Sequence, residues 1–202
     1  MFTICYDPIC VVLSKFSLTD HLLHLRIVLD LLKLHNFVVK LSKCVFAVPT
    51  VHYLGHVITV QGVKPDLEKV QAVRDWPEPH SLTALRGFLG LIGFYRRFVR
   101  NYATLAAPLT DLLRSTKFTW NTESSLAFTQ LKEKITSAPV LALPDFSQLF
   151  VVKTDASAVA IGAVLSQGGH TLAFFSKKMC PWLQASSTYV REMYAITEAI
   201  KK

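Results

Sequence analysis

Charged residues are scarce in this chain of 202 residues, and long hydrophobic runs are missing. Charged side chains make up 18% of the sequence and hydrophobic ones 51%. Disordered chains have the opposite composition, with low hydrophobicity and high charge, so a largely disordered chain is excluded. Apolar runs such as Ile9–Leu13 are far shorter than the ~20 residues of a membrane-spanning helix. The composition therefore predicts one or two compact domains and no membrane partner.

Cysteines are also few, and the four present are irregularly spaced. This excludes a disulfide framework and favours a reducing compartment. Cys44, His52 and His56 fit no common zinc spacing, and we expect them, like His21 and His24 on a helix, to be ordinary structural residues. No basic segment precedes the apolar start of the chain, so no secretory signal is expected. The sequence thus predicts an intracellular location, in the cytoplasm or the nucleus.

The positive charge is concentrated in the middle third of the chain. Residues 61–120 hold nine basic and five acidic side chains, half of the formal net charge of +8. Arginines at positions 86, 96, 97 and 100 alternate there with aromatic residues from Phe88 to Tyr102. Basic residues neutralise phosphates and aromatic rings stack on bases, so this mixture is typical of nucleic-acid binding. An ordinary amphipathic helix with a solvated basic face explains the pattern equally well.

Hydrophobic periodicity and turn residues predict the elements of the first part of the chain. They are a helix from Thr19 to about Leu34, strands at Phe37–Leu41 and Val45–Val48, and a hairpin at Val51–Val60 with a turn near Gly55.

The middle of the chain is expected to be helical. Asp66 begins a helix that ends at Trp76, before a Pro-Glu-Pro break, and Ser81 caps a long helix to roughly Phe98. Gly87, Gly90 and Gly93 recur along it, and this stripe indicates a close approach of another backbone, either a nucleic-acid strand or, as we favour, another helix. Further helices are expected after Pro108 and at 123–136.

The pattern changes after the proline-bounded segment Pro139–Pro144. Strands are expected at Leu149–Lys153, Val159–Leu165 and Thr171–Phe175, with a tight turn at Gly168-Gly169. Ser186-Ser187 caps a last helix that is expected to continue through Lys202, and we interpret the absence of a stop signal as truncation.

Two carboxylates in this last part are candidate metal ligands. Asp155 lies at the end of an apolar strand among small polar residues, a position that suits a Mg²⁺ ligand. Glu192 lies on the final helix and approaches Asp155 if that helix packs over the strands. Two-metal cleavage of phosphodiesters needs such a carboxylate cluster. A turn aspartate and a solvent-facing glutamate are the plainer alternatives.

Motifs along nearly the whole chain resemble the pol polyprotein of gypsy-type LTR retrotransposons. They are Asn36–Phe46 (NFVVKLSKCVF), Tyr53–Ile58 (YLGHVI), Leu85–Phe98 (LRGFLGLIGFYRRF), Thr154–Ser157 (TDAS), Ile161–Gln167 (IGAVLSQ), Phe175–Lys178 (FSKK) and Ser187–Ile196 (STYVREMYAI).

This resemblance implies an α+β fold in three parts. They are a reverse transcriptase palm remnant with a primer-grip-like hairpin (1–63), a helical thumb and connection (64–138), and the first half of an RNase H-like mixed sheet with one helix (139–202). In this family Asp155 and Glu192 are metal-binding catalytic carboxylates for Mg²⁺ or Mn²⁺. The residues implied to contact an RNA–DNA hybrid or a DNA duplex are Lys40, Lys43, Gly55, His56, Arg86, Arg96, Arg97 and Arg100. The remainder of a pol polyprotein is a further expected partner.

The departures from the family pattern concern catalysis. The polymerase carboxylate pair falls on Pro8 and Ile9, with Tyr6 and Asp7 as its only trace, and its loss removes metal ligands. The remaining RNase H carboxylates would lie beyond Lys202, so two carboxylates are expected to bind Mg²⁺ weakly.

Three hypotheses follow from the sequence. We favour a retroelement fragment without polymerase or nuclease activity. The alternatives are residual metal-dependent RNase H cleavage and a module that binds a nucleic-acid duplex without chemistry.

Overall fold

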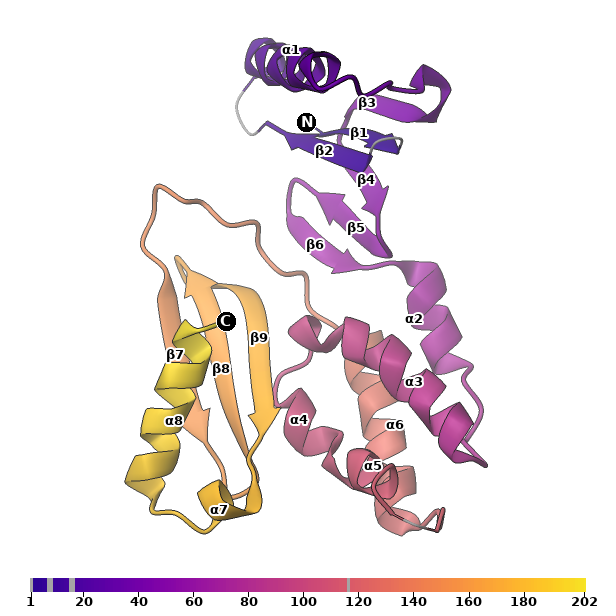
Figure 1. Cartoon of the computed structure of the whole chain (residues 1–202), viewed down its shortest axis with the longest axis vertical. Coiled ribbons are helices and arrows are strands. Elements are labelled where there is room, and N and C mark those ends of the chain that lie inside the picture. The colour runs from indigo at the N-terminus through magenta and orange to yellow at the C-terminus, as the bar shows by residue number, and fades with distance from the viewer. Residues whose placement is uncertain (1, 7–8, 15–16, 116) are drawn as a thin grey trace. The chain divides into compact units, whose positions relative to one another are not determined.

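The computed structural model describes residues 2–6, 9–14, 17–115 and 117–202 and divides into two compact units (Figure 1). Unit 1 comprises Met1–Val63 and unit 2 comprises Lys64–Lys202. Of the two positions where the polymerase carboxylate pair falls, Pro8 lies outside the described residues and Ile9 begins β2. Of its trace, Asp7 lies outside the described residues and Tyr6 ends β1.

Unit 1 contains a three-stranded antiparallel sheet and one long helix. Strand β1 (Phe2–Tyr6) lies between β2 (Ile9–Leu13) and β3 (Cys44–Val48). Helix α1 (Leu18–Leu34) begins where Ser17 Oγ accepts a hydrogen bond from Asp20 N–H. The predicted helix is thus confirmed to within one residue at its start.

A second small sheet in the order β4-β5-β6 follows β3. It consists of β4 (Thr50–Tyr53), β5 (His56–Thr59) and β6 (Gly62–Pro65). The turn between β4 and β5 places Leu54 at φ 46° and Gly55 at φ 74°. Two successive left-handed residues match the twist of a two-residue hairpin, so the hairpin expected around Gly55 is confirmed.

The strand predicted at Phe37–Leu41 is wrong. This segment is irregular up to Lys40 and continues into the 3-10 turn η1 (Leu41–Lys43). Asn36, at φ 60°, ends α1 in the left-handed region, and Phe37 and Val38 are exposed. Apolar residues without a neighbouring strand or a buried face cannot form a sheet, and β3 begins only where β1 offers a partner.

Unit 2 begins with a layer of helices. They are α2 (Leu67–Arg74), α3 (Leu82–Phe94), the 3-10 turn η2 (Arg96–Phe98), α4 (Tyr102–Leu105), α5 (Ala107–Leu112) and α6 (Thr122–Thr136). Their shared core consists of fully buried side chains, among them Leu85, Phe88, Ile92, Leu109, Leu131 and Ile135. The Phe88 and Phe128 rings lie 4.4 Å apart and join α3 to α6.

Helix α3 ends earlier than predicted, and its glycines have other neighbours than predicted. It ends at Phe94 instead of Phe98, and a 3-10 turn carries the chain to Phe98. A Cβ at Gly87 would contact the Trp76 ring at 3.5 Å, one at Gly93 would contact Tyr102, and one at Gly90 would contact nothing within 4 Å. The stripe therefore does not mark the close approach of another helix backbone that we favoured, and the approach of a nucleic-acid strand stays a prediction.

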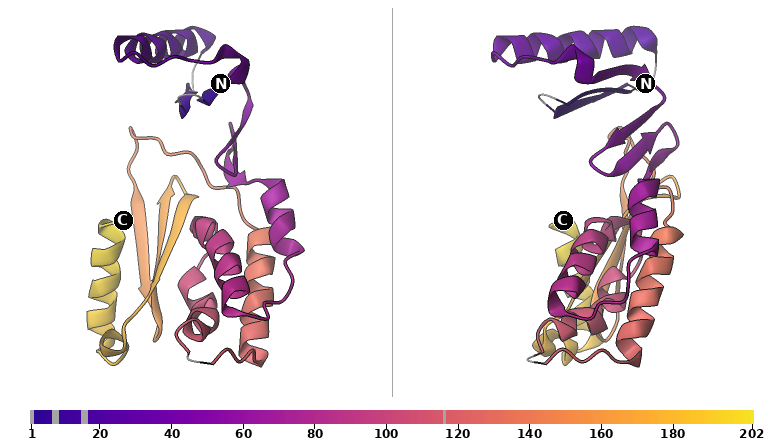
Figure 2. Two further views of the ribbon diagram at one scale, coloured as in Figure 1. Left: turned by 45° about the vertical axis from the view of Figure 1, so that its right-hand side comes forward. Right: turned by 90° about the vertical axis from the view of Figure 1, so that its right-hand side faces the viewer.

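The last part of unit 2 is an antiparallel sheet with a helix on one face (Figures 1 and 2). Its elements are β7 (Val151–Ala156), β8 (Ala160–Gln167), β9 (His170–Lys178), the short α7 (Pro181–Gln184) and α8 (Thr188–Ile200). Ala195 of α8 packs with Ile161, Met179 and Leu183 in a buried cluster. Helix α8 ends at Ile200 and does not continue through Lys202 as expected. The predicted α+β class is confirmed.

Direct contacts hold the helical layer against this sheet. Ala103 N–H at the start of α4 donates to Ser176 Oγ of β9 at 2.8 Å. Lys178 Nζ lies 2.6 Å from the Asp111 carboxylate of α5. Both contacts involve β9, so the segment between η2 and α5 is fixed beside this strand. No helix among the described residues is long and apolar enough to cross a membrane.

Candidate nucleic-acid interface

The four predicted arginines of the helical layer are all exposed, whereas most of the aromatic residues between them are buried. Phe88, Tyr95 and Phe98 are at most 1% exposed, whereas Phe94 is 52% exposed. The alternation of basic and aromatic residues therefore separates into a core and a surface. The buried rings are unavailable for stacking on bases, whereas the arginines and Phe94 are accessible on the surface.

Arg96, Arg97 and Arg100 form a basic turn, a name we use for these three residues. Tyr95, Phe98 and Val99 are buried between them and anchor this stretch of backbone in the core. The Arg97 guanidinium lies 5.8 Å from the centroid of the Phe98 ring. None of the three arginines forms an ion pair with another residue of the described ranges. The basic turn is thus a fixed cluster of three cations directed to solvent.

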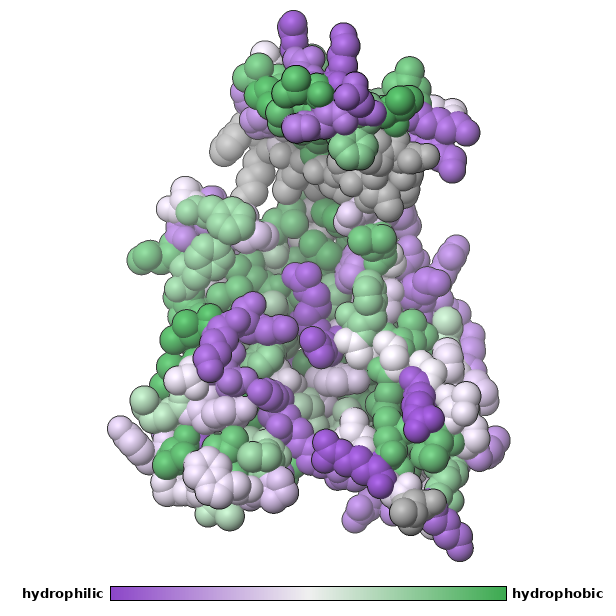
Figure 3. All heavy atoms as spheres, in the orientation of Figure 1, coloured by the Kyte–Doolittle hydropathy of each residue, from purple (hydrophilic) through white to green (hydrophobic). Residues whose placement is uncertain are grey.

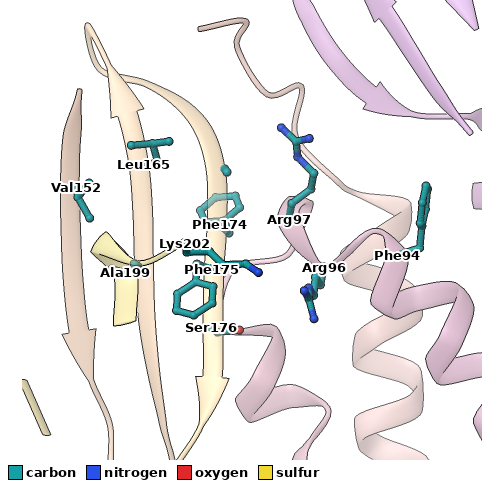
Figure 4. Close-up of a pocket in the computed structure, with 12 residues that line it drawn as sticks. Phe94, Arg96, Arg97, Val152, Leu165, Phe174, Phe175, Ser176, Ala199 and Lys202 are labelled. Atoms are coloured by element: carbon teal, nitrogen blue, oxygen red, sulfur yellow. The ribbon is translucent and has the colours of Figure 1, made fainter. Parts of the chain in front are cut away.

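The basic turn faces the sheet across an apolar cavity of about 440 Å³ (Figure 4). Arg96, Arg97 and Lys202 contribute cations to the lining. The apolar lining comes mainly from Phe94 and the strands, with Val152, Leu165, Phe174 and Phe175 among its residues. Figure 3 shows hydrophobic surface over these strands, near the C-terminal end of α8.

Burial raises the pKa of Tyr102, and the nearby Arg96 opposes that shift.

The candidate carboxylates Asp155 and Glu192 are both exposed and lie on packed elements, since α8 contacts β7. Ala156 packs against the buried cluster beneath α8. Because successive side chains of a strand point to opposite faces, Asp155 projects from the face away from α8. There it lines a polar cleft with Arg100 and Asn101.

The donor set for a metal ion is small. The described residues contain no group of three or more His, Cys, Asp or Glu side chains that could hold one. Two carboxylates fall short of the larger cluster that two-metal cleavage requires. The residues present therefore do not fit a two-Mg²⁺ centre, and the assignment of Asp155 and Glu192 as metal ligands stays a prediction.

An ion pair fixes α8 on the sheet next to these residues. Lys177 Nζ lies 2.6 Å from Glu198 Oε2 and 5.5 Å from the centroid of the Tyr194 ring. The hydrogen bond with Glu198 raises the pKa of Lys177, and it lowers the pKa of Glu198. Both groups are therefore charged at neutral pH, which keeps α8 in register with β9.

The remaining predicted contact residues lie in unit 1. Lys40 and Lys43 are exposed on either side of η1, and Lys43 N–H donates to Lys40 C=O at 2.9 Å. Gly55 forms the tip of the β4–β5 hairpin, and His56 Nδ1 lies 3.0 Å from Leu54 O. The hairpin geometry thus exists, and the contacts of these four residues with nucleic acid stay a prediction.

Sequence reasoning missed Asn101 and Lys153, which line the polar cleft beside Asp155. Lys153 carried a signal, because it precedes Asp155 by two residues on the same strand and so shares its face. Asn101 carried none, because only the contacts of α4 and α5 with β9 bring it to the sheet.

Comparisons with known proteins agree with this architecture. Residues 120–202 match the family described as the RNase H-like domain found in reverse transcriptase. Two solved structures of the foamy viral protease-reverse transcriptase cover 95% of this chain at 22% and 23% identity, with TM-scores of 0.81 and 0.82. This chain covers 35% and 27% of those chains. Residues 120–202 thus match an RNase H-like domain, and the chain as a whole has the fold of the corresponding part of the foamy viral structures.

Several curated proteins are similar in sequence to this chain. The retrovirus-related Pol polyproteins of the Drosophila melanogaster transposons 297 and gypsy are 40% and 35% identical over 95% and 98% of this chain. An uncharacterized mitochondrial protein of Arabidopsis thaliana is 46% identical over 64% of this chain and 84% of its own length. The chain is similar to retrovirus-related Pol polyproteins over nearly its whole length, and it spans 18% and 21% of the two Drosophila relatives.

Proposed function

We propose that this chain is the duplex-contacting segment of a reverse transcriptase–RNase H and that it binds an RNA–DNA hybrid or a DNA duplex. The observation that carries the proposal is the basic turn, whose three arginines are exposed and held on a buried aromatic anchor. Such a cluster neutralises phosphates without reading bases. The foamy viral structures similar in fold are complexes with double-stranded DNA and with RNA/DNA hybrid, which supports this choice of partner.

The partner proposal extends to the rest of the predicted set. In this proposal Arg86 on α3 adds a further phosphate contact to the basic turn. Lys40, Lys43, Gly55 and His56 of unit 1 serve the same duplex near the primer end. The remainder of a pol polyprotein completes the active enzyme, and the duplex partner places the protein inside the cell, in the cytoplasm or the nucleus.

Binding is tested with a fluorescein-labelled RNA–DNA hybrid in EDTA. The double variant Arg96→Ala/Arg97→Ala should bind at least about ten-fold more weakly, because each charged contact is worth roughly 1.5 kcal/mol or more. Arg114→Ala is the matched control, since it removes an exposed arginine of unit 2 that lies outside the basic turn. Equal affinity of the double variant and the control would exclude the basic turn as the contact surface.

We further propose that the chain by itself neither polymerises nor cleaves. Pro8 and Ile9 bring no carboxylate to the polymerase position, and Asp155 and Glu192 are two ligands where a two-metal reaction requires a larger cluster. Mg²⁺ or Mn²⁺ is therefore bound weakly, if both carboxylates engage it.

The absence of cleavage is checked with a labelled hybrid incubated with Mg²⁺ or Mn²⁺ and resolved on a denaturing gel. The expected result is an intact RNA strand. Cleavage that disappears in the Asp155→Asn variant would establish the residual RNase H activity that we considered from the sequence. Cleavage that persists in this variant would indicate a contaminating nuclease.

A further inference from the structure

The face of the β7–β9 sheet that points away from α8 is hollowed into a polar cleft of about 580 Å³. Strands β7 and β8 provide Lys153, Asp155, Gly162 and Val164 to its lining, and the helical layer provides Arg100 and Asn101. Its volume falls within the range of small-ligand sites, and its lining combines two cations, one carboxylate and several neutral polar groups. This composition suits an anionic ligand with a sugar attached.

Asn101 is placed in this cleft by an unusual backbone. Its φ of 58° lies in the left-handed region, which asparagine tolerates better than most residues. Immediately after it, α4 begins and is tied to β9 through the bond from Ala103 N–H to Ser176 Oγ. A Cβ added at Gly162 would lie 3.3 Å from Asn101 Oδ1, so the amide sits directly over β8. The position of this amide is therefore fixed by both parts of unit 2.

The charges in the cleft are arranged with opposite signs on one strand. Lys153 and Asp155 share a face of β7, and Arg100 approaches from the side of the helical layer. No residue of the described segments forms an ion pair with any of these three side chains. The two cations are thus available to an anion, while Asp155 opposes its approach.

We propose that Arg100, Asn101 and Lys153 form a subsite for one phosphodiester group of the duplex backbone, with the attached nucleotide beside Phe174. Phe174 lines the cleft and is half-buried, so one ring face is accessible to a base or a sugar. The inference rests on the proposed duplex binding and adds a contact that shares Arg100 with the basic turn and brings in Asn101 and Lys153 beside it. It extends the nucleic-acid surface from the helical layer onto the sheet.

The subsite predicts opposite effects for neighbouring residues of the same strand. In EDTA, Lys153→Ala should weaken hybrid binding about five- to ten-fold, and it should reduce the slope of log affinity against log salt by about 0.9, the effect of one lost phosphate contact. Asp155→Asn should instead strengthen binding by about three-fold, because it removes a negative charge beside the phosphate. Asn101→Gly keeps the left-handed backbone, removes the amide, and should weaken binding with an unchanged salt slope.

Lys134→Ala is the control, since Lys134 is an exposed lysine of α6 outside the cleft. Circular dichroism and thermal unfolding establish that each variant is folded before its affinity is compared. Weakened binding by Lys153→Ala and Asn101→Gly, together with strengthened binding by Asp155→Asn, supports the subsite. If Lys153→Ala equals the control while Arg96→Ala/Arg97→Ala still weakens binding, the subsite is overturned and the proposed duplex binding stands. If none of these variants differs from its control, both proposals fail.

Discussion

Burial of single side chains determines which part of the basic segment reaches a ligand. The sequence from Phe88 to Tyr102 mixes rings and guanidinium groups, which is typical both of nucleic-acid binding and of an ordinary amphipathic helix. In the structure, Tyr95 and Phe98 are 1% exposed, and the arginines next to them are exposed. Exposed arginines above buried rings are what an amphipathic helix with a solvated basic face predicts, and the binding of nucleic acid by these arginines stays a prediction.

A buried histidine links the elements of unit 1. His21 on α1 is 1% exposed, and its Nε2 lies 2.7 Å from Thr3 Oγ1 of β1. Its Nδ1 lies 3.0 Å from Ser14 Oγ, which in turn lies 2.9 Å from His24 Nδ1. Ala47 N–H also donates to Thr3 Oγ1. This network joins α1 to β1, to the end of β2 and to the segment of β3, a role that helical spacing alone did not reveal.

The stability of unit 1 should fall as the pH falls because of His21. Burial lowers the pKa of His21 below its ordinary value, so the folded unit binds fewer protons than the unfolded one. The stabilisation is complete above the unfolded pKa of about 6.5 and is lost as the pH falls from there towards the folded pKa. Hydrogen exchange of the α1 amides measures this loss of stability. Tryptophan fluorescence would report on unit 2 instead, because the tryptophans all lie there.

The comparison for this prediction is between two histidine variants. His21→Asn should reduce the dependence of α1 protection on pH between about 5 and 6.5, whereas His170→Asn, at an exposed turn of unit 2, should leave it unchanged. The same pH dependence in the wild type and in His21→Asn would show that another group is responsible.

Helix starts are the elements that the chain specifies most clearly. Ser17, Asp66, Ser81, Asn121 and Ser187 each accept a hydrogen bond from a backbone N–H of the first helical turn. Side chains of this kind satisfy donors that have no partner within the helix. The first residues of α2, α3 and α8 could therefore be predicted closely from the sequence.

Removal of the α3 cap should destabilise unit 2. Ser81 Oγ accepts from Ala84 N–H at 3.2 Å, and Ser81→Ala should lower the free energy of unfolding by about 1 kcal/mol. Urea unfolding followed by tryptophan fluorescence measures this change. Thr83→Ala, an exposed substitution within the same helix, is expected to change it by less than about 0.5 kcal/mol. Equal effects of the two substitutions would contradict the capping role.

Tertiary contacts account for the elements that the sequence did not predict. Strands β1 and β2 have only five residues each, too few for periodicity to distinguish a strand from a helix. Phe37–Leu41 has the composition of a strand but no partner. Helix α3 ends at Phe94 because the following residues turn Tyr95 and Phe98 into the core.

In the candidate site, too, local sequence predicted some features and tertiary contacts determine the others. The sequence predicted Asp155 at the end of a strand, and β7 ends one residue after it; the last helix also contacts β7, which was the condition for Glu192 to approach Asp155. The alternation of β7 nevertheless directs Asp155 away from α8, towards Arg100 and Asn101. This neighbourhood arises from residues more than 50 positions apart, which no local pattern reports.

At the scale of the whole molecule, the chain corresponds to one part of much longer relatives. It spans about a fifth of the length of the Drosophila Pol relatives. Val152 is 45% exposed on the sheet, whereas Ile161 is 1% exposed because α7 and α8 cover it. Half of the net charge of +8 lies in residues 61–120, and the basic turn presents three of these cations together.

The salt dependence of hybrid affinity tests the central claim most directly. Titrations between about 50 and 200 mM salt should give a linear decrease of log affinity against log salt. The triple variant Arg96→Ala/Arg97→Ala/Arg100→Ala should reduce that slope by about 2.7, the sum of three phosphate contacts. A triple variant with the affinity and the salt slope of the wild type would contradict the account that the basic turn grips the duplex.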